Sequence, residues 1–257
     1  MPSTRLDGRV ALITGSSRGI GRGCAVCMAA AGADVVVNYR SHPEDAEQTA
    51  RLVRAFGRRA LVVGADVSRR DEVARLIDAA VRELGHLDIA VANAYRSIRK
   101  PFLELLPEDF EAVVAVSLLG TFHTCQLAAR QMVRQGGGGK IIIISSVLAE
   151  RALSTSAPYN ACKAAINQMG RTMANELARY RINVNVIEPG WIDTPGERSF
   201  ATEEEIQREG RKLPWGRLGT PEEIGAVAAF LASDAAEYMS GSIVKADGAY
   251  MAALGEF

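Results

Sequence analysis

The sequence predicts an α/β fold built on one doubly wound parallel sheet, with about seven strands and helices on both faces. Two observations predict it: short, continuously apolar runs recur along the chain, and charged amphipathic segments of ten or more residues separate them. Strands buried on both faces have such a pattern, and their parallel pairing needs helical crossovers. With 257 residues, 48% of them hydrophobic, the chain can form one sizeable core, so we expect a single domain over residues 1–257.

The elements follow one another in a regular alternation. An apolar β-rich run at residues 10–14 ends at a glycine, and a helix is predicted over residues 20–31, stopped by Gly32. Further strands are predicted at residues 35–37, 60–63, 89–92, 141–144, 184–187 and 242–244. The glycines at 136–139 predict a flexible turn. Residues 193–214 are polar and follow a strand end, where such sheets bind ligands, so we predict a helical lid or substrate loop there.

Composition excludes several classes of protein. Thirty basic residues balance thirty acidic ones, so no large field favours nucleic acid or an anionic membrane. No apolar run approaches the roughly 20 residues that span a bilayer, and residues 1–9 lack the apolar stretch of a signal peptide, so we expect a cytoplasmic protein. Cys24 and Cys27 form a C-x-x-C without a second pair or a nearby histidine, which favours buried packing. The three histidines are scattered, so no metal site is predicted.

A glycine-rich turn is the first functional signal. Gly15, Gly19 and Gly21 lie between the first predicted strand and the first predicted helix. Glycine permits a tight turn and lets backbone N–H groups approach a pyrophosphate, and the helix N-terminus adds partial positive charge. The sequence therefore predicts a dinucleotide-binding Rossmann fold, with Ser17, Arg18 and Ile20 of the same turn beside the cofactor.

The end of the second strand favours NADP(H) over NAD(H). An NAD site places a carboxylate there for the ribose 2′-hydroxyl, whereas this chain reads Asn38, Tyr39, Arg40 and Ser41. Arg40, together with Arg18, can pair with a 2′-phosphate, because guanidinium groups bond phosphate bidentately. We therefore expect contacts to the cofactor from residues 39–41; the alternative is that both arginines are ordinary solvated charges.

Several further motifs occur in a fixed order. They are Asp66-Val67, Asn93-Ala94, Ser145-Ser146, Tyr159-x-x-x-Lys163, the stretch Pro189 to Thr194, and the stretch Gly216 to Glu223. With the glycine turn, they make the chain resemble a short-chain dehydrogenase/reductase over essentially its whole length. The string at residues 35–41 is similar to the branch that contains 3-oxoacyl-carrier-protein reductases and glucose 1-dehydrogenases.

The resemblance implies a role for each motif. Tyr159 would be the acid/base at the carbonyl or alcohol oxygen, Lys163 would bind the nicotinamide ribose and lower the pKa of the tyrosine, and Ser146 would hydrogen-bond the substrate oxygen. The remaining cofactor contacts would come from Asp66, Val67, Asn93, Pro189, Gly190, Ile192 and Thr194. Physical chemistry agrees: a free tyrosine has a pKa near ~10, nearby positive charge stabilises its phenolate, and a four-residue spacing puts Tyr159 and Lys163 on one helix face.

Two positions depart from the family pattern. The family usually has glycine where this chain has Tyr95, and a bulky side chain there could narrow the pocket or shift the backbone. The family commonly has an asparagine where this chain has Ser117, and that asparagine anchors a water in a proton relay from the lysine. Our hypothesis is that the Ser117 hydroxyl preserves this catalytic relay; the alternative is that it merely packs.

We therefore expect an NADP(H)-dependent oxidoreductase that interconverts a carbonyl and a secondary alcohol. A 3-oxoacyl thioester or small ketone is the first expectation for its substrate, and a sugar, as for glucose 1-dehydrogenase, is the alternative. A non-catalytic NADP(H)-binding regulator is a further alternative, against which the intact Ser146, Tyr159 and Lys163 argue. The resemblance also implies a homotetramer or dimer.

Overall fold

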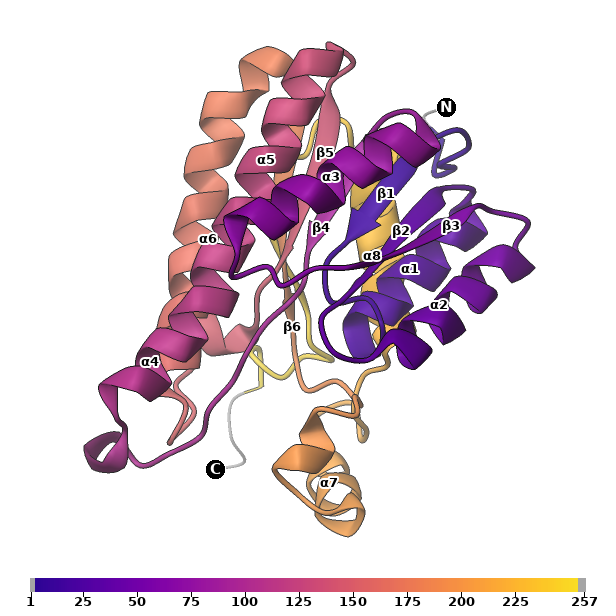
Figure 1. The fold of residues 1–257 in the computed structure, drawn as a ribbon. Coiled ribbons are helices and arrows are strands. Elements are labelled where there is room, and N and C mark those ends of the chain that lie inside the picture. Colours follow the sequence, from indigo (N-terminus) through magenta and orange to yellow (C-terminus); the bar gives the residue numbers. More distant parts are fainter. Residues whose placement is uncertain (1–2, 254–257) are drawn as a thin grey trace.

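The sheet has seven parallel strands in the order β3-β2-β1-β4-β5-β6-β7 (Figure 1). The computed structural model describes residues 3–253. The strands are β1 (Val10–Ile13), β2 (Asp34–Tyr39), β3 (Ala60–Gly64), β4 (Ile89–Ala92), β5 (Gly139–Ile144), β6 (Ile182–Pro189) and β7 (Ile243–Ala246). Strand order reverses between β1 and β4, and a doubly wound sheet opens a ligand crevice at the carboxyl ends of the strands at such a point.

These strands confirm the predicted fold class, and each predicted apolar run lies in or beside one of them. One boundary differs: Gly139, expected in a turn, is the first residue of β5 and pairs with Ile182. A Cβ at Gly139 would lie 2.4 Å from the Sδ atom of Met132. This glycine therefore serves close helix–strand packing as well as the turn before it.

Helices cover both faces of the sheet. One face carries α1 (Gly19–Ala31), α2 (Pro43–Ala55) and α8 (Pro221–Ala232), and the other carries α3 (Arg70–Leu84), α5 (Gly120–Gln135) and α6 (Ala157–Leu177). Two shorter helices, α4 (Pro107–Val114) and α7 (Glu203–Gly210), lie toward the carboxyl ends of the strands (Figure 1). Short 3₁₀ turns are Phe102–Glu104, Val147–Ala149, Ala178–Tyr180, Glu197–Ser199 and Asp234–Ala236.

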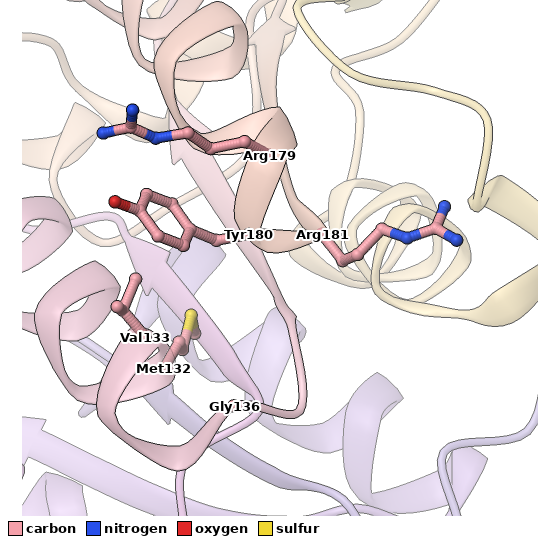
Figure 2. A pocket seen from close by; sticks show the side chains of 6 residues that line it. All are labelled: Met132, Val133, Gly136, Arg179, Tyr180 and Arg181. Atoms are coloured by element: carbon pink, nitrogen blue, oxygen red, sulfur yellow. The ribbon is translucent and has the colours of Figure 1, made fainter.

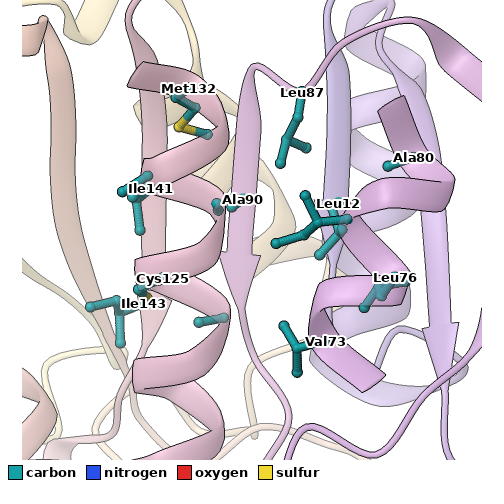
Figure 3. Close-up of a cluster of buried hydrophobic side chains, with 14 of the residues drawn as sticks. Leu12, Val73, Leu76, Ala80, Leu87, Ala90, Cys125, Met132, Ile141 and Ile143 are labelled. Carbon is teal, nitrogen blue, oxygen red and sulfur yellow. The ribbon is translucent and has the colours of Figure 1, made fainter. Parts of the chain in front are cut away.

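Alternate residues of each strand feed two apolar layers. On the α3–α5–α6 face, Leu12 and Ala90 of the strands meet Leu76 of α3 and Cys125 and Met132 of α5 (Figure 3). All five side chains are fully buried. Fully burying a side chain of leucine or methionine size contributes about 1.5–3 kcal/mol, so these layers hold the strand ends that carry the site in fixed positions.

Helices α1 and α8 approach each other through glycine. A Cβ at Gly23 would lie 2.2 Å from the carbonyl oxygen of Pro221, and one at Gly225 would lie 2.3 Å from the carbonyl oxygen of Gly23. No other residue type fits either position without moving a backbone. The helix that follows the glycine turn is thus fixed directly against α8.

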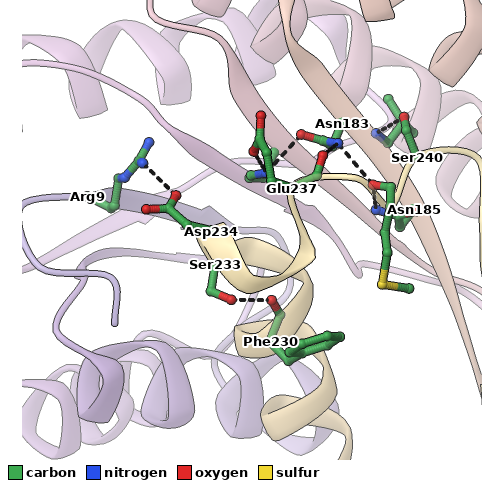
Figure 4. A network of polar contacts seen from close by, with 11 residues as sticks. Arg9, Asn183, Asn185, Phe230, Ser233, Asp234, Glu237 and Ser240 are labelled. Atoms are coloured by element: carbon green, nitrogen blue, oxygen red, sulfur yellow. Dashed lines mark hydrogen bonds and ion pairs between the residues drawn. The ribbon is translucent and has the colours of Figure 1, made fainter. Parts of the chain in front are cut away.

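Two asparagines, the half-buried Asn183 and the buried Asn185, anchor β6 to the segment that leads into β7 (Figure 4). The side-chain amide of Asn183 donates to the carbonyl oxygens of Glu237 and Met239, and that of Asn185 donates to Met239. The buried Lys140 ammonium donates to Asn183 Oδ1 at 2.8 Å and pairs with Glu237. These polar groups find their hydrogen-bond partners within the fold. We therefore assign them a structural role, at the end of the sheet opposite the carboxyl ends of the strands.

Residues 107–135 form one continuous helical run that is long and apolar enough, by length and composition, to cross a membrane. This differs from the expectation that no such run exists. Half of its most apolar window is buried inside the protein, and Cys125, Ala128 and Met132 pack in the core layer of Figure 3. Within the described structure it is therefore a core helix with one exposed apolar side.

Candidate active site

A cleft of about 870 Å³ opens at the carboxyl ends of the strands. It brings together residues from opposite ends of the sequence. All of the predicted site residues except Ser117 line it: Gly15, Ser17, Arg18, Gly19, Ile20, Gly21, Tyr39, Arg40, Ser41, Asp66, Val67, Asn93, Ser146, Tyr159, Lys163, Pro189, Gly190, Ile192 and Thr194. The cleft lies where the change in strand order predicts a ligand crevice.

The glycine turn requires its glycines for two different reasons. Gly15 and Gly19 have φ angles of +62° and +56°, in the left-handed region that other residues rarely adopt. Gly21 is helical, but a Cβ there would lie 2.5 Å from the carbonyl oxygen of Gly15 and 2.6 Å from Asn93 Nδ2. The absence of side chains leaves the backbone of the turn open to the cleft, which suits a pyrophosphate.

Two asparagines hold this turn in place. The side-chain oxygen of Asn38 accepts a hydrogen bond from the N–H of Gly15 at 3.0 Å. Asn93 Nδ2 donates to the carbonyl oxygens of Thr14 and Gly15, at 2.8 and 3.2 Å. Asn93, predicted to contact the cofactor, thus also joins the end of β4 to the glycine turn.

Arg18 and Arg40 are exposed cations at the β2 side of the cleft. Among residues 3–253, no carboxylate lies within ion-pair distance of either guanidinium. Their charge is not neutralised by the protein, so both guanidinium groups can meet an anionic ligand.

Helix α6 carries the reactive pair. Lys163 is buried, and its Nζ atom donates to the carbonyl oxygen of Ile144 at 2.6 Å and lies 5.4 Å from the centroid of the Tyr159 ring. Burial lowers the pKa of Lys163 to about 8. Burial also raises the pKa of Tyr159, and the neighbouring Ser146 hydroxyl acts in the opposite direction. Because desolvation disfavours phenolate, activation of Tyr159 depends on positive charge brought into the cleft.

Tyr95 lies directly over this pair. Its ring meets the ring of Tyr159 edge to face, with centroids 5.9 Å apart, and lies 5.9 Å from Lys163 Nζ. A Cβ at Gly196 would lie 2.9 Å from the Tyr95 hydroxyl oxygen, so the tyrosine reaches the opposite wall of the cleft. The side chain at this position therefore narrows the cleft, one of the two effects expected from the sequence.

Ser117 is buried outside the cleft lining, in a π-helical turn at Ala115–Leu119 between α4 and α5. Its hydroxyl accepts from the N–H of Arg96 at 3.0 Å and donates to the carbonyl oxygen of Arg96 at 2.9 Å. The hydroxyl proton is thus engaged by Arg96 and not directed at Lys163. The serine holds the chain segment that follows Tyr95.

The cleft also contains residues for which the sequence predicted no role. Among them are Arg96, Arg99, Trp191 and Glu197. The Trp191 indole donates to Glu197 Oε2 at 2.9 Å, and Arg99 stacks on the ring of Phe200 with its guanidinium carbon 3.9 Å from the centroid. Residues 93–101 have no regular secondary structure, so no periodicity in the sequence indicated which side chains face the cleft.

A second hollow, of about 250 Å³, lies between the carboxyl ends of α5 and α6 (Figure 2). It is shallow, and Arg179 covers the ring of Tyr180 there at 4.8 Å. None of its lining residues resembles an acid, base or nucleophile arranged for catalysis. Among residues 3–253, no group of three His, Cys, Asp or Glu side chains is placed to hold a metal ion, and the four cysteines are free thiols.

Comparison with known proteins gives consistent matches over the whole fold. Residues 15–251 match the family model described as enoyl-(acyl carrier protein) reductase. The 2-dehydro-3-deoxy-D-gluconate 5-dehydrogenase of Escherichia coli is 37% identical over 96% of this chain and 97% of its own length. A gluconate 5-dehydrogenase from Burkholderia cenocepacia, solved in complex with NADP and tartrate, is 38% identical with a TM-score of 0.90 over 98% of both chains.

A third relative carries the other nicotinamide cofactor. A 7α-hydroxysteroid dehydrogenase, solved with NADH and 7-oxo glycochenodeoxycholic acid, is 36% identical with a TM-score of 0.89 over 95% of both chains.

Proposed function

Because the chain belongs to the short-chain dehydrogenase/reductase family, and is thus an NAD(P)-dependent oxidoreductase acting on CH–OH and C=O groups, we propose that it uses NADP(H) and that Tyr159 is its acid/base. The observation that carries this proposal is the shared cleft: Ser146, Tyr159 and Lys163 face the same space as the glycine turn. That arrangement brings a proton donor and a dinucleotide site together, as carbonyl reduction requires.

The residues present fit a dinucleotide. The glycine turn offers bare backbone, Asp66 and Val67 line the far part of the cleft, and Ile192 and Thr194 line the other wall. A Cβ at Gly19 would lie 3.5 Å from the Thr194 side chain, so the two walls approach each other at the turn. When bound, the nicotinamide supplies or accepts the hydride.

The protein's own part is orientation and proton transfer. The Ser146 hydroxyl holds the substrate oxygen, and Tyr159 gives a proton to that oxygen during reduction and takes it back during oxidation. Lys163 holds the cofactor ribose, and its ammonium stabilises the Tyr159 phenolate that remains after proton donation. Its buried position makes this charge more effective than an exposed one, because water screens it less.

Arg18 and Arg40 support NADP(H) over NAD(H). Both are exposed, neither has a carboxylate partner in the described structure, and β2 ends at Tyr39 and is followed by Arg40-Ser41 without an acidic residue. The Burkholderia relative binds NADP and the hydroxysteroid dehydrogenase binds NADH, so family membership is compatible with either cofactor and the proposal rests on these two arginines.

For the substrate, the relatives favour the sugar-type alternative over a 3-oxoacyl thioester. Two of them are dehydrogenases of gluconate type, and Tyr95 narrows the cleft beside Tyr159. We therefore propose a small polyhydroxylated ketone or alcohol. A non-catalytic regulator is the weaker alternative, since all three predicted catalytic residues in the cleft are intact.

The test is a cofactor and substrate assay on the purified protein. A panel of small secondary alcohols and ketones is assayed with NADP(H) and with NAD(H), for the wild type, Tyr159→Phe and Arg40→Ala. Turnover should favour NADP(H), Tyr159→Phe should lose about 10²–10⁴-fold in rate, and Arg40→Ala should raise KM for NADP(H) alone. A preference for NAD(H), or a fully active Tyr159→Phe, refutes the respective assignment.

We also propose a cytoplasmic homo-oligomer, a dimer or a tetramer. Large apolar side chains are exposed along two stretches of the chain, one with Phe102, Leu103, Leu106, Phe110, Leu119 and Phe122 and the other with Trp215, Phe230 and Tyr238. Exposed apolar patches commonly mark protein interfaces, and two different two-fold faces suffice to build a tetramer.

A further inference from the structure

The substrate end of the cleft carries more positive than negative charge. Arg99 and Lys163 lie near Tyr159, Arg96 lines the same cleft, and Glu197 is the acidic residue on this side of it. Lys163 serves the acid/base pair, which leaves two arginines without a role in the chemistry proposed above. Both residues are exposed, so guanidinium donors that meet no protein acceptor are open to water or to a ligand in the cleft.

Arg99 is held in one orientation without using its hydrogen-bond donors. Its guanidinium lies 3.9 Å from the centroid of the Phe200 ring, a cation–π contact that fixes the plane of the group. Its Nη2 atom lies 3.8 Å from Glu197 Oε2, which is an ion pair but longer than a hydrogen bond. That carboxylate oxygen already accepts from the Trp191 indole. Within residues 3–253, no protein acceptor receives a hydrogen bond from the Arg99 guanidinium.

The position of Arg99 relates it to the reacting oxygen. Its charge lowers the pKa of Tyr159, against the larger opposing effect of burial, so it acts within the electrostatic reach of the hydroxyl. Arg96 lies three residues earlier in the same segment, and Ser117 fixes its backbone by two hydrogen bonds. The Arg99 guanidinium has unused donors and is held by stacking near the site proposed for the substrate carbonyl. It is therefore suited to bind a carboxylate of the same substrate molecule.

Building on the proposed function, we propose that Arg99, assisted by Arg96, binds the carboxylate of a polyhydroxy acid whose hydroxyl carbon reacts at Tyr159. The enzyme then discriminates an acid from the neutral polyol of the same shape. The carboxylate replaces water as the partner of the free Arg99 donors, while the stack on Phe200 and the ion pair with Glu197 keep the guanidinium in place.

The experiment compares two substrates that differ in one group. D-Gluconate and D-sorbitol share the same hydroxylated chain, and only the first ends in a carboxylate. Oxidation of each with NADP is measured for the wild type, Arg99→Gln, Arg96→Gln and the control Arg75→Gln, an exposed arginine on α3. We expect the wild type to prefer D-gluconate at least about tenfold in kcat/KM, mainly through a lower KM. The reason is that only D-gluconate can form a charge-assisted hydrogen bond with Arg99.

Arg99→Gln should lose roughly 10- to 100-fold on D-gluconate and change little on D-sorbitol, and Arg96→Gln should show a smaller loss in the same direction. Arg75→Gln should match the wild type. Equal kcat/KM values for both substrates in the wild type, or an equal loss on both in Arg99→Gln, overturn the proposal while leaving the proposed oxidoreductase function intact.

Equilibrium titration covers the case in which neither polyol is oxidised. Each is titrated into the enzyme saturated with NADP, and tighter binding of D-gluconate that Arg99→Gln abolishes supports the proposal. Failure of D-gluconate to bind more tightly than D-sorbitol overturns it. Selective binding without turnover of any alcohol in the panel would instead count against the proposed function and leave the carboxylate site standing.

Discussion

At the scale of single residues, the contacts of Ser117 change the role that we assign to it. From the sequence it is a short substitute for an asparagine in a water relay. In the structure its hydroxyl both accepts from and donates to the Arg96 backbone. A side chain that joins a helix to a neighbouring segment in this way acts by positioning, because it moves Arg96 and Tyr95 if it is lost.

Removal of this hydroxyl should therefore affect stability and substrate binding, and not proton transfer. Ser117→Ala leaves the N–H and the carbonyl of Arg96 without their partner, which we expect to cost about 1–3 kcal/mol of unfolding free energy and to raise the substrate KM. The pH dependence of kcat should keep its shape. The measurements are chemical denaturation and pH–rate profiles, with Thr172→Ala on the exposed side of α6 as the control.

The opposite result has a clear meaning. A Ser117→Ala variant with wild-type stability but an altered pH–rate profile would restore the relay hypothesis.

The residues with a fixed sequence signature could be predicted, and those without one could not. The glycine turn, Ser146, Tyr159 and Lys163 have characteristic neighbours and spacing, and they share the cleft as expected. Arg96 and Arg99 lie in an irregular segment whose side-chain directions depend on contacts with Ser117 and Phe200. Those partners are distant in sequence, so periodicity gave no information about them.

At the scale of elements, the contact between α1 and α8 links the cofactor turn to the rest of the fold. Gly23 and Gly225 allow the two backbones to touch. The α1 helix begins at Gly19, inside the predicted phosphate-binding turn, so a displacement of α1 displaces the turn as well.

Gly225→Ala tests this coupling. The added methyl would lie 2.3 Å from the Gly23 carbonyl oxygen, so the helices must separate, and overpacking of this kind costs about 1–3 kcal/mol. We expect a lower melting temperature and a higher KM for the nicotinamide cofactor. Gly137→Ala is the matched control, because a Cβ there meets nothing within 4 Å. Equal effects of the two substitutions would show that helix contact is unimportant.

Element types were predictable because buried strands and amphipathic helices differ in period, and all seven strands were found. The ends of the strands were less predictable. Strand β6 extends from Ile182 to Pro189, beyond both ends of the apolar run at 184–187. The additional residues include Asn183 and Glu188, which are polar and hydrogen-bonded by side chains distant in sequence. The π turn at Ala115–Leu119 contains no glycine or proline from which it could have been predicted.

At the scale of the whole molecule, the exposed apolar side of residues 102–122 is the feature that a monomer does not explain. Leu103 is 96% exposed and Phe102 is 75% exposed. The helical run at residues 107–135, which follows these two residues, has the hydropathy of a membrane span, yet its other side is part of the core. The dimer or tetramer proposed above would bury this exposed side against a second copy of the chain.

We expect the wild type to sediment as a dimer or tetramer, and Leu103→Glu combined with Phe110→Glu to shift it to a smaller species. Charges placed on an apolar interface cost desolvation without gaining partners. Leu52→Glu on α2, a leucine of similar exposure to Phe110, is the control and should leave the mass unchanged. Analytical ultracentrifugation decides, and a monomeric wild type would rule out the proposed assembly.

The clamps on either side of residue 95 have a practical consequence for protein engineering. Asn93 is bonded to the first turn and Arg96 to Ser117, so the main chain there is anchored independently of the side chain between them. Position 95 can therefore be varied by saturation mutagenesis with little penalty to folding. Small residues would admit bulkier ketones above Tyr159, which makes this single codon the first choice for a library that widens substrate scope.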